Sequence, residues 1–382
     1  MKVFVTDANE KHALAAIRAL GREKATVHAG ANTHCALSFF SRHCSRRVVY
    51  PDPVTQEMNF VQFLIRYAES EKIDVLLPIS YYPNLIVSKY KHIISKYTHV
   101  CIADYGQMLT AADKRKTVLF AESLGIKVPK VYDSIDEIDN YPVVIKPTKG
   151  SGAVSYVNSP EGLRGLDFKN MLIQEYVPGS GYGFYGLFQH GTPKAIFMHK
   201  RRREFPVTGG ASSAAESYYD EHLKEQGIQL LSALQWHGVA MVEMKRDKRD
   251  EQYKLMEINP KFWGSLDLAI QAGVNFPYLT ARMAVYGDVD PVMEYDRNVK
   301  FCWPFPSDLL HMLAQPKSIS QFFVDLFDPK MKTNVCFNDF LPNLYLIGMT
   351  PFVIASRVLK GRLYFPHGKP DFPHGSFGSS RS

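Results

Sequence analysis

Three oxygen-bearing side chains near the middle of the chain have the types and spacing of a metal site. Glu257 and Asn259 are two residues apart, so on a strand both side chains would leave the same face. A carboxylate and an amide oxygen side by side suit a hard cation such as Mg²⁺. Pro260 cannot supply a ladder N–H, so we expect the strand to stop there. The residues thus predict a pair of metal ligands at a strand end.

A third candidate ligand, Glu243, lies near the end of an earlier predicted strand, 238–244. The wholly polar run 246–252 that follows predicts a hairpin loop. If Glu243 lies opposite Glu257, the two carboxylates repel each other, and a bound divalent cation would offset that repulsion. An exposed hairpin whose acids simply face water is the alternative, and the hairpin by itself leaves both interpretations open.

Two further stretches have residues that suit a nucleotide. A predicted strand at 142–146 ends at Lys146 and runs into a Gly-Ser-Gly loop at 150–152, whose backbone N–H groups could wrap phosphate oxygens. Such a loop is often only a turn, although the lysines on each side favour phosphate binding. A second strand at 172–177 leaves through Pro178 and Gly179, where main-chain groups could meet an adenine edge and Glu175 a ribose hydroxyl.

Four consecutive cations at 200–203 precede a flexible segment that contains Gly209 and Gly210. Such a run is commonly a solvated face. Its closeness in sequence to the acids favours contact with a phosphate or carboxylate being transferred. On a strand, Arg201 and Arg203 would share a face, so we expect these two side chains to act together.

The composition excludes several classes of protein. The chain has 382 residues, 46% of them hydrophobic and 22% charged, with a net charge of +7, which favours anionic ligands without demanding nucleic acid. Its five cysteines are widely spread and form no C-x-x-C pair, which argues against a disulfide framework or a zinc site and for a reducing cytoplasm. We expect no signal peptide, since a strand begins at once.

The two ends of the chain differ in pattern. Strand and helix patterns alternate through residues 1–106, which predicts a doubly wound parallel sheet; no G-x-G-x-x-G follows the first strand, so a dinucleotide is not expected there. The segment 340–362 is apolar, interrupted by Pro342 and Pro351, and basic at its end. Peripheral contact with a membrane and packing on its own domain both remain open. We expect residues 366–382 to be disordered.

Taken together, the order of these elements resembles the ATP-grasp superfamily, in the manner of carboxylate–amine ligases and carbamoyl-phosphate synthases. The resemblance covers roughly residues 1–290. It implies an α/β N-terminal domain (1–106) followed by an ATP-grasp fold of two α+β subdomains. These would be a small lid (107–186) and a catalytic subdomain (187–300), followed by an extension of unknown role (301–365).

The resemblance also implies roles for individual residues. The nucleotide ATP would be held by Lys114 and Lys146 at its phosphates, by the loop Gly150, Ser151 and Gly152, and by Glu175, Tyr176 and Val177 at the adenosine. Mg²⁺, or Mn²⁺ in its place, would be carried by Glu243, Glu257 and Asn259. The acid substrate or transferred phosphoryl group would meet Arg201, Arg203 and Lys261, with Arg202 as an alternative. Two departures from the family pattern are the lack of a glutamate after Gly179 and a lysine, not an arginine, at position 261.

The function implied is an ATP- and Mg²⁺-dependent ligase that joins a small-molecule carboxylate to an amine or thiol through an acyl phosphate. A kinase using the same site, and a nucleotide-gated scaffold with a partner- or membrane-binding C-terminus, are the alternatives. We expect a cytoplasmic protein with no nucleic-acid partner. A homo-oligomer and membrane association stay open.

Overall fold

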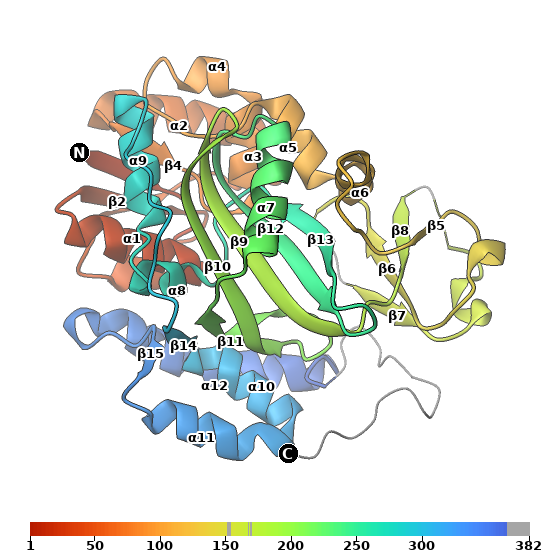
Figure 1. Ribbon diagram of the computed structural model, residues 1–382. Helices are drawn as coiled ribbons and strands as arrows, with labels where there is room; N and C mark the ends of the chain where they lie inside the picture. The colour runs from red at the N-terminus through yellow and green to blue at the C-terminus, as the bar shows by residue number, and fades with distance from the viewer. Residues whose placement is uncertain (151–153, 167, 169, 365–382) are drawn as a thin grey trace.

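The computed structural model describes residues 1–150, 154–166, 168 and 170–364. Ser151 and Gly152 of the predicted glycine loop lie outside these ranges, as does the predicted disordered tail. The described part contains three sheets, of four, seven and four strands. In Figure 1 the N-terminal sheet and the small sheet lie on opposite sides of the large one, and the C-terminal helices lie beneath it.

The N-terminal region is the predicted parallel sheet with helices around it, in strand order β3-β2-β1-β4. Its elements are β1 (Lys2–Val5), α1 (Lys11–Arg22), β2 (Thr26–Ala31), η1 (Leu37–Phe40), β3 (Cys44–Val49), α2 (Glu57–Glu71), β4 (Val75–Leu77), α3 (Tyr81–Lys89) and α4 (Lys91–Ile94). A strand that the sequence also predicts at 100–103 does not form. The carbonyls of Ile102 and Ala103 instead accept hydrogen bonds from the side chains of Lys91 and Ser88.

The chain after the N-terminal sheet forms two successive helices, α5 (Tyr105–Ala112) and α6 (Lys114–Ser123). Asp113 lies between them with extended backbone angles, and its carboxylate accepts the N–H groups of Arg115 and Lys116. Aspartate favours this N-cap position because its side chain satisfies N–H groups that have no partner within the helix. The break places Lys114 at the first turn of α6.

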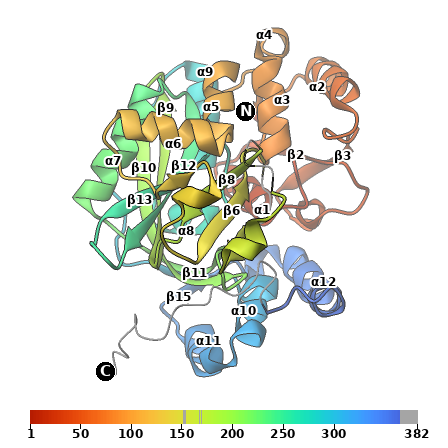
Figure 2. The same cartoon turned by 90° about the vertical axis from the view of Figure 1, so that its right-hand side faces the viewer.

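The small sheet is antiparallel, in the order β5-β8-β6-β7. Its elements are β5 (Val131–Tyr132), η2 (Ile135–Glu137), β6 (Val143–Pro147), β7 (Ser155–Val157), η3 (Pro160–Leu163) and β8 (Met171–Glu175). It has its own small core, in which Tyr132, Val143, Ile145, Leu163 and Ile173 are buried. Figure 2 shows this sheet in front of the large one, on the side of β12 and β13.

The large sheet has the order β13-β12-β9-β10-β11-β14-β15 and is antiparallel except for its last pair. Its strands are β9 (Gly179–Gln189), β10 (Thr192–Phe205), β11 (Ala211–Ser217), β12 (Gly238–Asp247), β13 (Tyr253–Asn259), β14 (Lys300–Cys302) and β15 (Met331–Thr333). Helix α7 (Glu221–Ala233) packs on β9 and β10. The helices α8 (Leu266–Gln271) and α9 (Phe276–Tyr286) pack against α1, so one apolar core joins the N-terminal region to the large sheet.

Two of the expected domain boundaries cut through strands. Position 186 lies within β9 and position 300 within β14, and both strands pair inside the large sheet. Splitting a strand from its ladder would leave backbone groups unpaired. We therefore propose boundaries near 176, at the exit from β8, and after 302.

The C-terminal region consists of short helices under the large sheet: η4 (Pro304–Asp308), α10 (Leu309–Ala314), η5 (Pro316–Ser318), α11 (Ile319–Phe327), η6 (Phe337–Asp339) and α12 (Leu341–Leu359). The apolar segment that the sequence shows as interrupted by prolines is one continuous helix, α12. Pro342 lies in its first turn, where a missing N–H costs nothing, and Pro351 lies inside it. None of the helices in the described part of the chain is long and apolar enough to cross a membrane.

Candidate functional site

A cleft of about 530 Å³ opens between the small sheet and the large one. It is lined from one side by β6 and β8 and from the other by β10, β11, β12, β13 and the turn after β13. Its charged lining residues are the cations Lys114, Lys146, Arg201, Lys245 and Lys261 and the acids Glu175, Glu243 and Glu257. With five cations against three carboxylates, the cleft suits an anionic ligand such as a polyphosphate.

The predicted pairing of Glu243 with Glu257 is confirmed, since the two residues are directly opposite each other in the β12–β13 ladder. The Asn259 side chain lies next to them and donates a hydrogen bond of 2.8 Å to Glu257 Oε1. β13 ends at Asn259, just before Pro260, as the sequence predicts. The hairpin thus places two carboxylates and an amide on one wall of the cleft.

Nearby cations balance the repulsion between the two carboxylates. Lys114 Nζ lies 3.6 Å from Glu257 Oε2, and Arg201 Nη2 lies 2.9 Å from Glu243 Oε1. Burial alone would raise the pKa of Glu257, but Lys114 and Lys146 together lower the pKa below its ordinary value. Glu257 is therefore a carboxylate at neutral pH, as a metal ligand must be.

These residues fit a divalent cation with oxygen ligands. Glu243 and Glu257 offer carboxylate oxygens from adjacent strands, and Asn259 offers an amide from the same face. The described residues contain no cluster of three or more His, Cys, Asp or Glu side chains that could hold a metal. The set is therefore two protein carboxylates and an amide, which leaves positions for water and phosphate oxygens, as Mg²⁺ sites commonly do.

Three lysines complete the charged wall of the cleft. Burial lowers the pKa of Lys146, of Lys245 and of Lys261. The opposing effect comes mainly from Glu257 on Lys146 and Lys261 and from Glu204 on Lys245. A buried ammonium without a matched carboxylate is costly, and a bound phosphate or carboxylate would relieve that cost. Lys245 was not predicted, although it lies two residues after Glu243 and therefore on the same strand face.

The glycine loop is described only at its start. Lys114 Nζ donates a 2.7 Å hydrogen bond to the carbonyl of Gly150, whose φ of 76° lies in the left-handed region that glycine adopts without strain. Lys146 lies at the end of β6, on the cleft wall. Two lysines and the start of the loop thus meet where the sequence predicts the phosphates.

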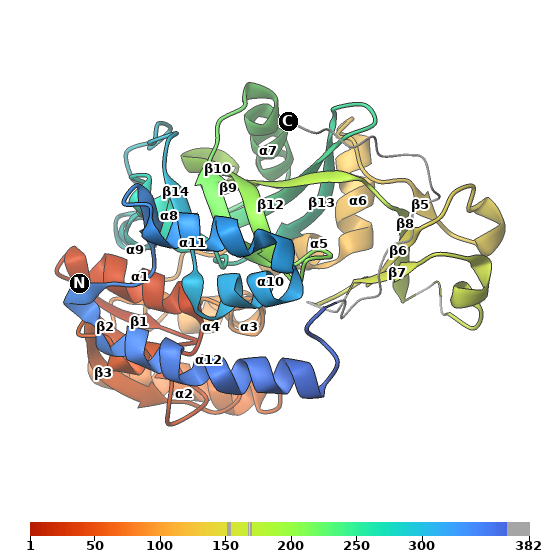
Figure 3. The same ribbon diagram turned by 90° about the horizontal axis from the view of Figure 1, so that it is seen from below.

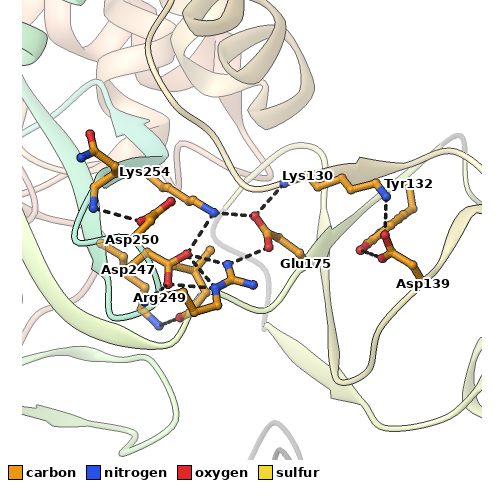
Figure 4. Close-up of polar contacts among 11 residues, drawn as sticks. Lys130, Tyr132, Asp139, Glu175, Asp247, Arg249, Asp250 and Lys254 are labelled. Atoms are coloured by element: carbon orange, nitrogen blue, oxygen red, sulfur yellow. Dashed lines mark hydrogen bonds and ion pairs between the residues drawn. The ribbon is translucent and has the colours of Figure 1, made fainter. Parts of the chain in front are cut away.

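The predicted adenosine-binding stretch lines the cleft through Glu175, Tyr176 and Val177. Glu175 is already held: its carboxylate accepts from Lys254 Nζ at 2.8 Å and from Arg249 Nη2 at 2.7 Å (Figure 4). Burial would raise the pKa of Glu175, but Lys254 and Arg249 outweigh it and lower the pKa. The carboxylate expected to meet the ribose is therefore tied to the β12–β13 hairpin.

The predicted partnership of Arg201 and Arg203 is wrong. The β10–β11 pairing shifts register between Arg201 and Arg203 and again after Arg203, so the two side chains do not share a face. Arg201 lines the cleft, whereas Arg203 is buried against Asp308 and Asp325 of the C-terminal region.

The other basic residues of the candidate substrate site also separate. Arg202, the alternative, pairs with Glu216 at 2.8 Å and does not line the cleft. Lys261 does line the cleft, in the turn after β13. Of the candidate cations for the acid substrate, Arg201 and Lys261 therefore remain together.

A hydrogen-bonded group at the inner end of the cleft was not predicted. Tyr185 and Ser265 line the cleft, and His199 Nε2 lies 2.8 Å from Ser265 Oγ and also bonds the Tyr185 hydroxyl. Burial, with Arg201 second, lowers the pKa of His199 to about 3, so its imidazole is neutral. The three residues lie on β9, β10 and just before α8, so no local spacing could have joined them.

Comparison with known proteins gives the class of protein. A family model described as "ATP-grasp in the biosynthetic pathway with Ter operon" matches residues 167–303, which include β9 to β13 and the carboxylate hairpin. The match covers about a third of the chain, and with the sheet arrangement it shows an ATP-grasp fold.

Individual relatives are similar in fold more than in sequence. An L-amino acid ligase from Bacillus licheniformis is 16% identical, with a TM-score of 0.60 over 76% of this chain and 77% of that one. The biotin carboxylase domain of 2-oxoglutarate carboxylase from Hydrogenobacter thermophilus, solved with ADP, its magnesium salt and bicarbonate, is 13% identical, with a TM-score of 0.60 over 78% and 72%. A D-alanine–D-alanine ligase from Fusobacterium nucleatum is 54% identical over 35 residues, which span 9% of this chain and 12% of that enzyme.

Proposed function

We propose that the protein is an ATP- and Mg²⁺-dependent ligase that joins a small-molecule carboxylate to an amine. The observation that carries the proposal is the Glu243–Glu257 pair in a cleft that also holds five cations. A carboxylate pair with a neighbouring amide suits the metal, and the surplus of cations suits the polyphosphate and an acid substrate. Two of the solved structures with a similar fold are an L-amino acid ligase and a biotin carboxylase domain with bound ADP, which supports the same chemistry.

Each group of residues takes a role from its place in the cleft. Lys114 and Lys146 contact phosphate oxygens near the start of the glycine loop, and Tyr176 and Val177 face the adenosine. Glu243, Glu257 and Asn259 hold Mg²⁺, which when bound draws charge from the terminal phosphates of ATP. Arg201 and Lys261 hold the carboxylate of the acid substrate against the terminal phosphate. Mn²⁺ would fit the same oxygen ligands.

The proposed reaction balances in two transfers. A substrate carboxylate oxygen bonds to the γ-phosphorus of ATP. The bond between that phosphorus and the oxygen shared with the β-phosphate breaks, which gives an acyl phosphate and ADP. The neutral amine then bonds to the acyl carbon as the bond from that carbon to the phosphate oxygen breaks, and phosphate leaves with the former carboxylate oxygen and the proton that the amine loses. Arg201 and Lys261 stabilise the oxyanion charge in both steps, and the small sheet over the cleft keeps water from the acyl phosphate.

The test is to supply mixed pools of carboxylates and amines with ATP and Mg²⁺ and to measure both ADP and free phosphate. We expect the two products to appear in equal amounts, and only when an acid and an amine are both present. ADP without free phosphate would show a kinase and overturn the ligase.

A variant links that activity to the carboxylate pair. Glu257→Gln removes a metal ligand and should lower turnover by roughly 10²–10³-fold. Glu216→Gln is the matched control, because Glu216 pairs with Arg202 away from the cleft and should keep full activity. Full turnover in Glu257→Gln would contradict the assigned site.

The five cysteines are unpaired. Free thiols are typical of a reducing compartment, so we propose that the protein works in the cytoplasm.

A further inference from the structure

The C-terminal helix α12 exposes a continuous apolar stripe that no part of the described chain covers. Leu344, Ile347, Pro351 and Val358 follow one another at intervals of three, four and seven residues, so they share one helix face, and each is exposed. Phe352 beside them is 69% exposed. Single exposed apolar residues are ordinary on a protein surface, but a continuous stripe marks an interaction site.

The stripe forms one side of an apolar groove of about 680 Å³. Phe305 and Leu309 line the opposite side, and of the nine described residues around the groove Thr350 is the one polar member. Helix α11 adds further exposed apolar side chains, among them Val324 at 61% and Phe327 at 77%. Seen from below, α10, α11 and α12 lie together toward the viewer (Figure 3). The apolar surface therefore extends over one side of the molecule.

The charges on α12 and just after it have one sign, whereas half-buried Asp328 lies beside the cations that follow α11. Residues 340–364 contain three cations, Arg357, Lys360 and Arg362, and no aspartate or glutamate. Lys330 and Lys332, in the segment between α11 and α12, are also exposed. An apolar helix face with cations at its end is the pattern of a helix that lies in the headgroup region of an anionic bilayer. Exposed aromatic side chains such as Phe352 suit the same region.

A second copy of the chain fits the surface less well. Around a twofold axis each copy would present the same surface to the other, which brings the same cations together without carboxylates to neutralise them. Anionic headgroups neutralise those cations and accept the apolar stripe at the same time.

The surface is held rigidly on the enzyme. Arg18 of α1 and Asp339, just before α12, form a buried ion pair of 2.8 Å, and Tyr345 of α12 stacks on Phe40. Near the end of α12, Arg357 lies over the ring of Phe205, 5.7 Å from its centroid. Phe205 ends β10, so α12 is attached to the large sheet as well as to the N-terminal region.

We propose that the stripe of α12, with the neighbouring groove and basic residues, docks the protein on an anionic lipid bilayer. The docking surface is separate from the cleft. Binding therefore does not depend on ATP or on the proposed ligase activity.

The test is co-sedimentation of the full chain with vesicles of phosphatidylcholine alone or mixed with phosphatidylglycerol. We expect binding to the mixed vesicles, weakened by added salt, and little binding to the neutral ones. Phe352→Ser should weaken binding about tenfold by exposing less apolar area to lipid. Lys360→Glu with Arg362→Glu should weaken it roughly thirtyfold by reversing two charges.

The control is Met58→Ser, because Met58 is 52% exposed on α2, which lies at the opposite end of the molecule from α12 in Figure 1. It should bind vesicles like the unaltered protein. Equal binding to neutral and anionic vesicles, or no binding to either, would overturn the proposal. A stable dimer by light scattering that Phe352→Ser converts to a monomer would also overturn it and assign the surface to self-association.

Discussion

Arg201 and Arg203 lie two residues apart on β10 but in two different charged clusters, one open to the cleft and one closed. Arg201 faces an open cleft where cations outnumber carboxylates among the lining residues, and its partners Glu204 and Glu243 keep 28% and 21% of their side-chain surface exposed. Arg203 lies in a closed cluster with Asp308 and Asp325, whose side chains are 1% and 5% exposed.

The difference shows that the charge balance of a cluster can distinguish residues that bind a ligand from residues that hold the fold together. In the closed cluster, Arg203 Nε and Nη2 both reach the Asp308 carboxylate, at 2.8 and 2.7 Å, and Ser213 Oγ adds a third donor. Arg202 Nη2 also lies 4.0 Å from Asp325, so two arginines meet two aspartates and no charge there awaits a ligand.

In the cleft the lining cations outnumber the lining carboxylates, and with Glu204, which pairs with Arg201 at 3.3 Å, they are still in excess; an anion from outside would balance that excess. We infer that the cleft binds substrate and that the Arg203 cluster attaches the C-terminal region to the large sheet.

The largest expected effect tests the closed cluster. Arg203→Met should lower the free energy of unfolding by about 3–5 kcal/mol, because it leaves two buried carboxylates without a counter-charge. The measurement is urea unfolding followed by circular dichroism. Turnover per folded molecule should change little, since Arg203 does not line the cleft.

A matched substitution controls for the loss of a cation from the same strand. Arg202→Met removes a partly exposed pair with Glu216 and a longer contact of 4.0 Å with Asp325, so it should cost clearly less than Arg203→Met, about 1 kcal/mol. Equal destabilisation by the two variants would show that the Arg203 cluster has no special structural role.

The next effect, on activity, tests the open cluster. Arg201→Met should lower kcat/KM roughly 100-fold, because it removes a charge held against the reacting oxygens. Its effect on unfolding should be smaller than that of Arg203→Met, since water can reach Glu243 through the cleft. Steady-state kinetics beside the same unfolding measurement separates the two effects.

Arg201→Lys keeps a cation there but loses the planar fork, so it should recover part of the activity. If Arg201→Met left kcat/KM unchanged and lowered stability, Arg201 would have a structural role like that of Arg203. The proposed difference between the two clusters would then be wrong.

Local spacing was enough to predict the carboxylate hairpin. Glu257 and Asn259 lie two residues apart on β13. The polar run 246–252 predicted the hairpin loop, and a loop at that place puts Glu243 opposite Glu257. The alternating pattern of the first 80 residues likewise predicted the N-terminal parallel sheet. These features depend on neighbours in sequence and on the two-residue period of a strand.

The remaining features depend on contacts between distant segments. The bulge that separates Arg201 from Arg203 is fixed by where β10 meets β11 and by two aspartates more than 100 residues away. The Tyr185–His199–Ser265 group joins three elements, and the engagement of Glu175 depends on the far hairpin. A strand period of two cannot foresee a register shift.

The smallest effect is expected for a third cluster, around Asp247. Its exposure to solvent is intermediate, because Asp247 is buried while Arg249 is 49% exposed. Asp247 on β12 bonds Arg249 and Lys254, which in turn hold Glu175 of the small sheet (Figure 4). Burial would raise the pKa of Asp247, but Arg249 and Lys254 lower the pKa to about 2.

Because this pKa lies below the ordinary value of about 3.9, the folded protein binds the proton less readily than the unfolded chain. The contribution of Asp247 to stability is therefore complete above about pH 4 and is lost as the pH falls toward about 2. Asp247→Asn should cost about 1–2 kcal/mol at pH 7, reduced by solvent around the half-exposed Arg249, and less at pH 3. Asp250→Asn, in the same hairpin but exposed, is the control and should show no such pH dependence. If urea midpoints of Asp247→Asn and the unaltered protein differ by the same amount at both pH values, the cluster contributes no charge-dependent stability and resembles an ordinary surface network.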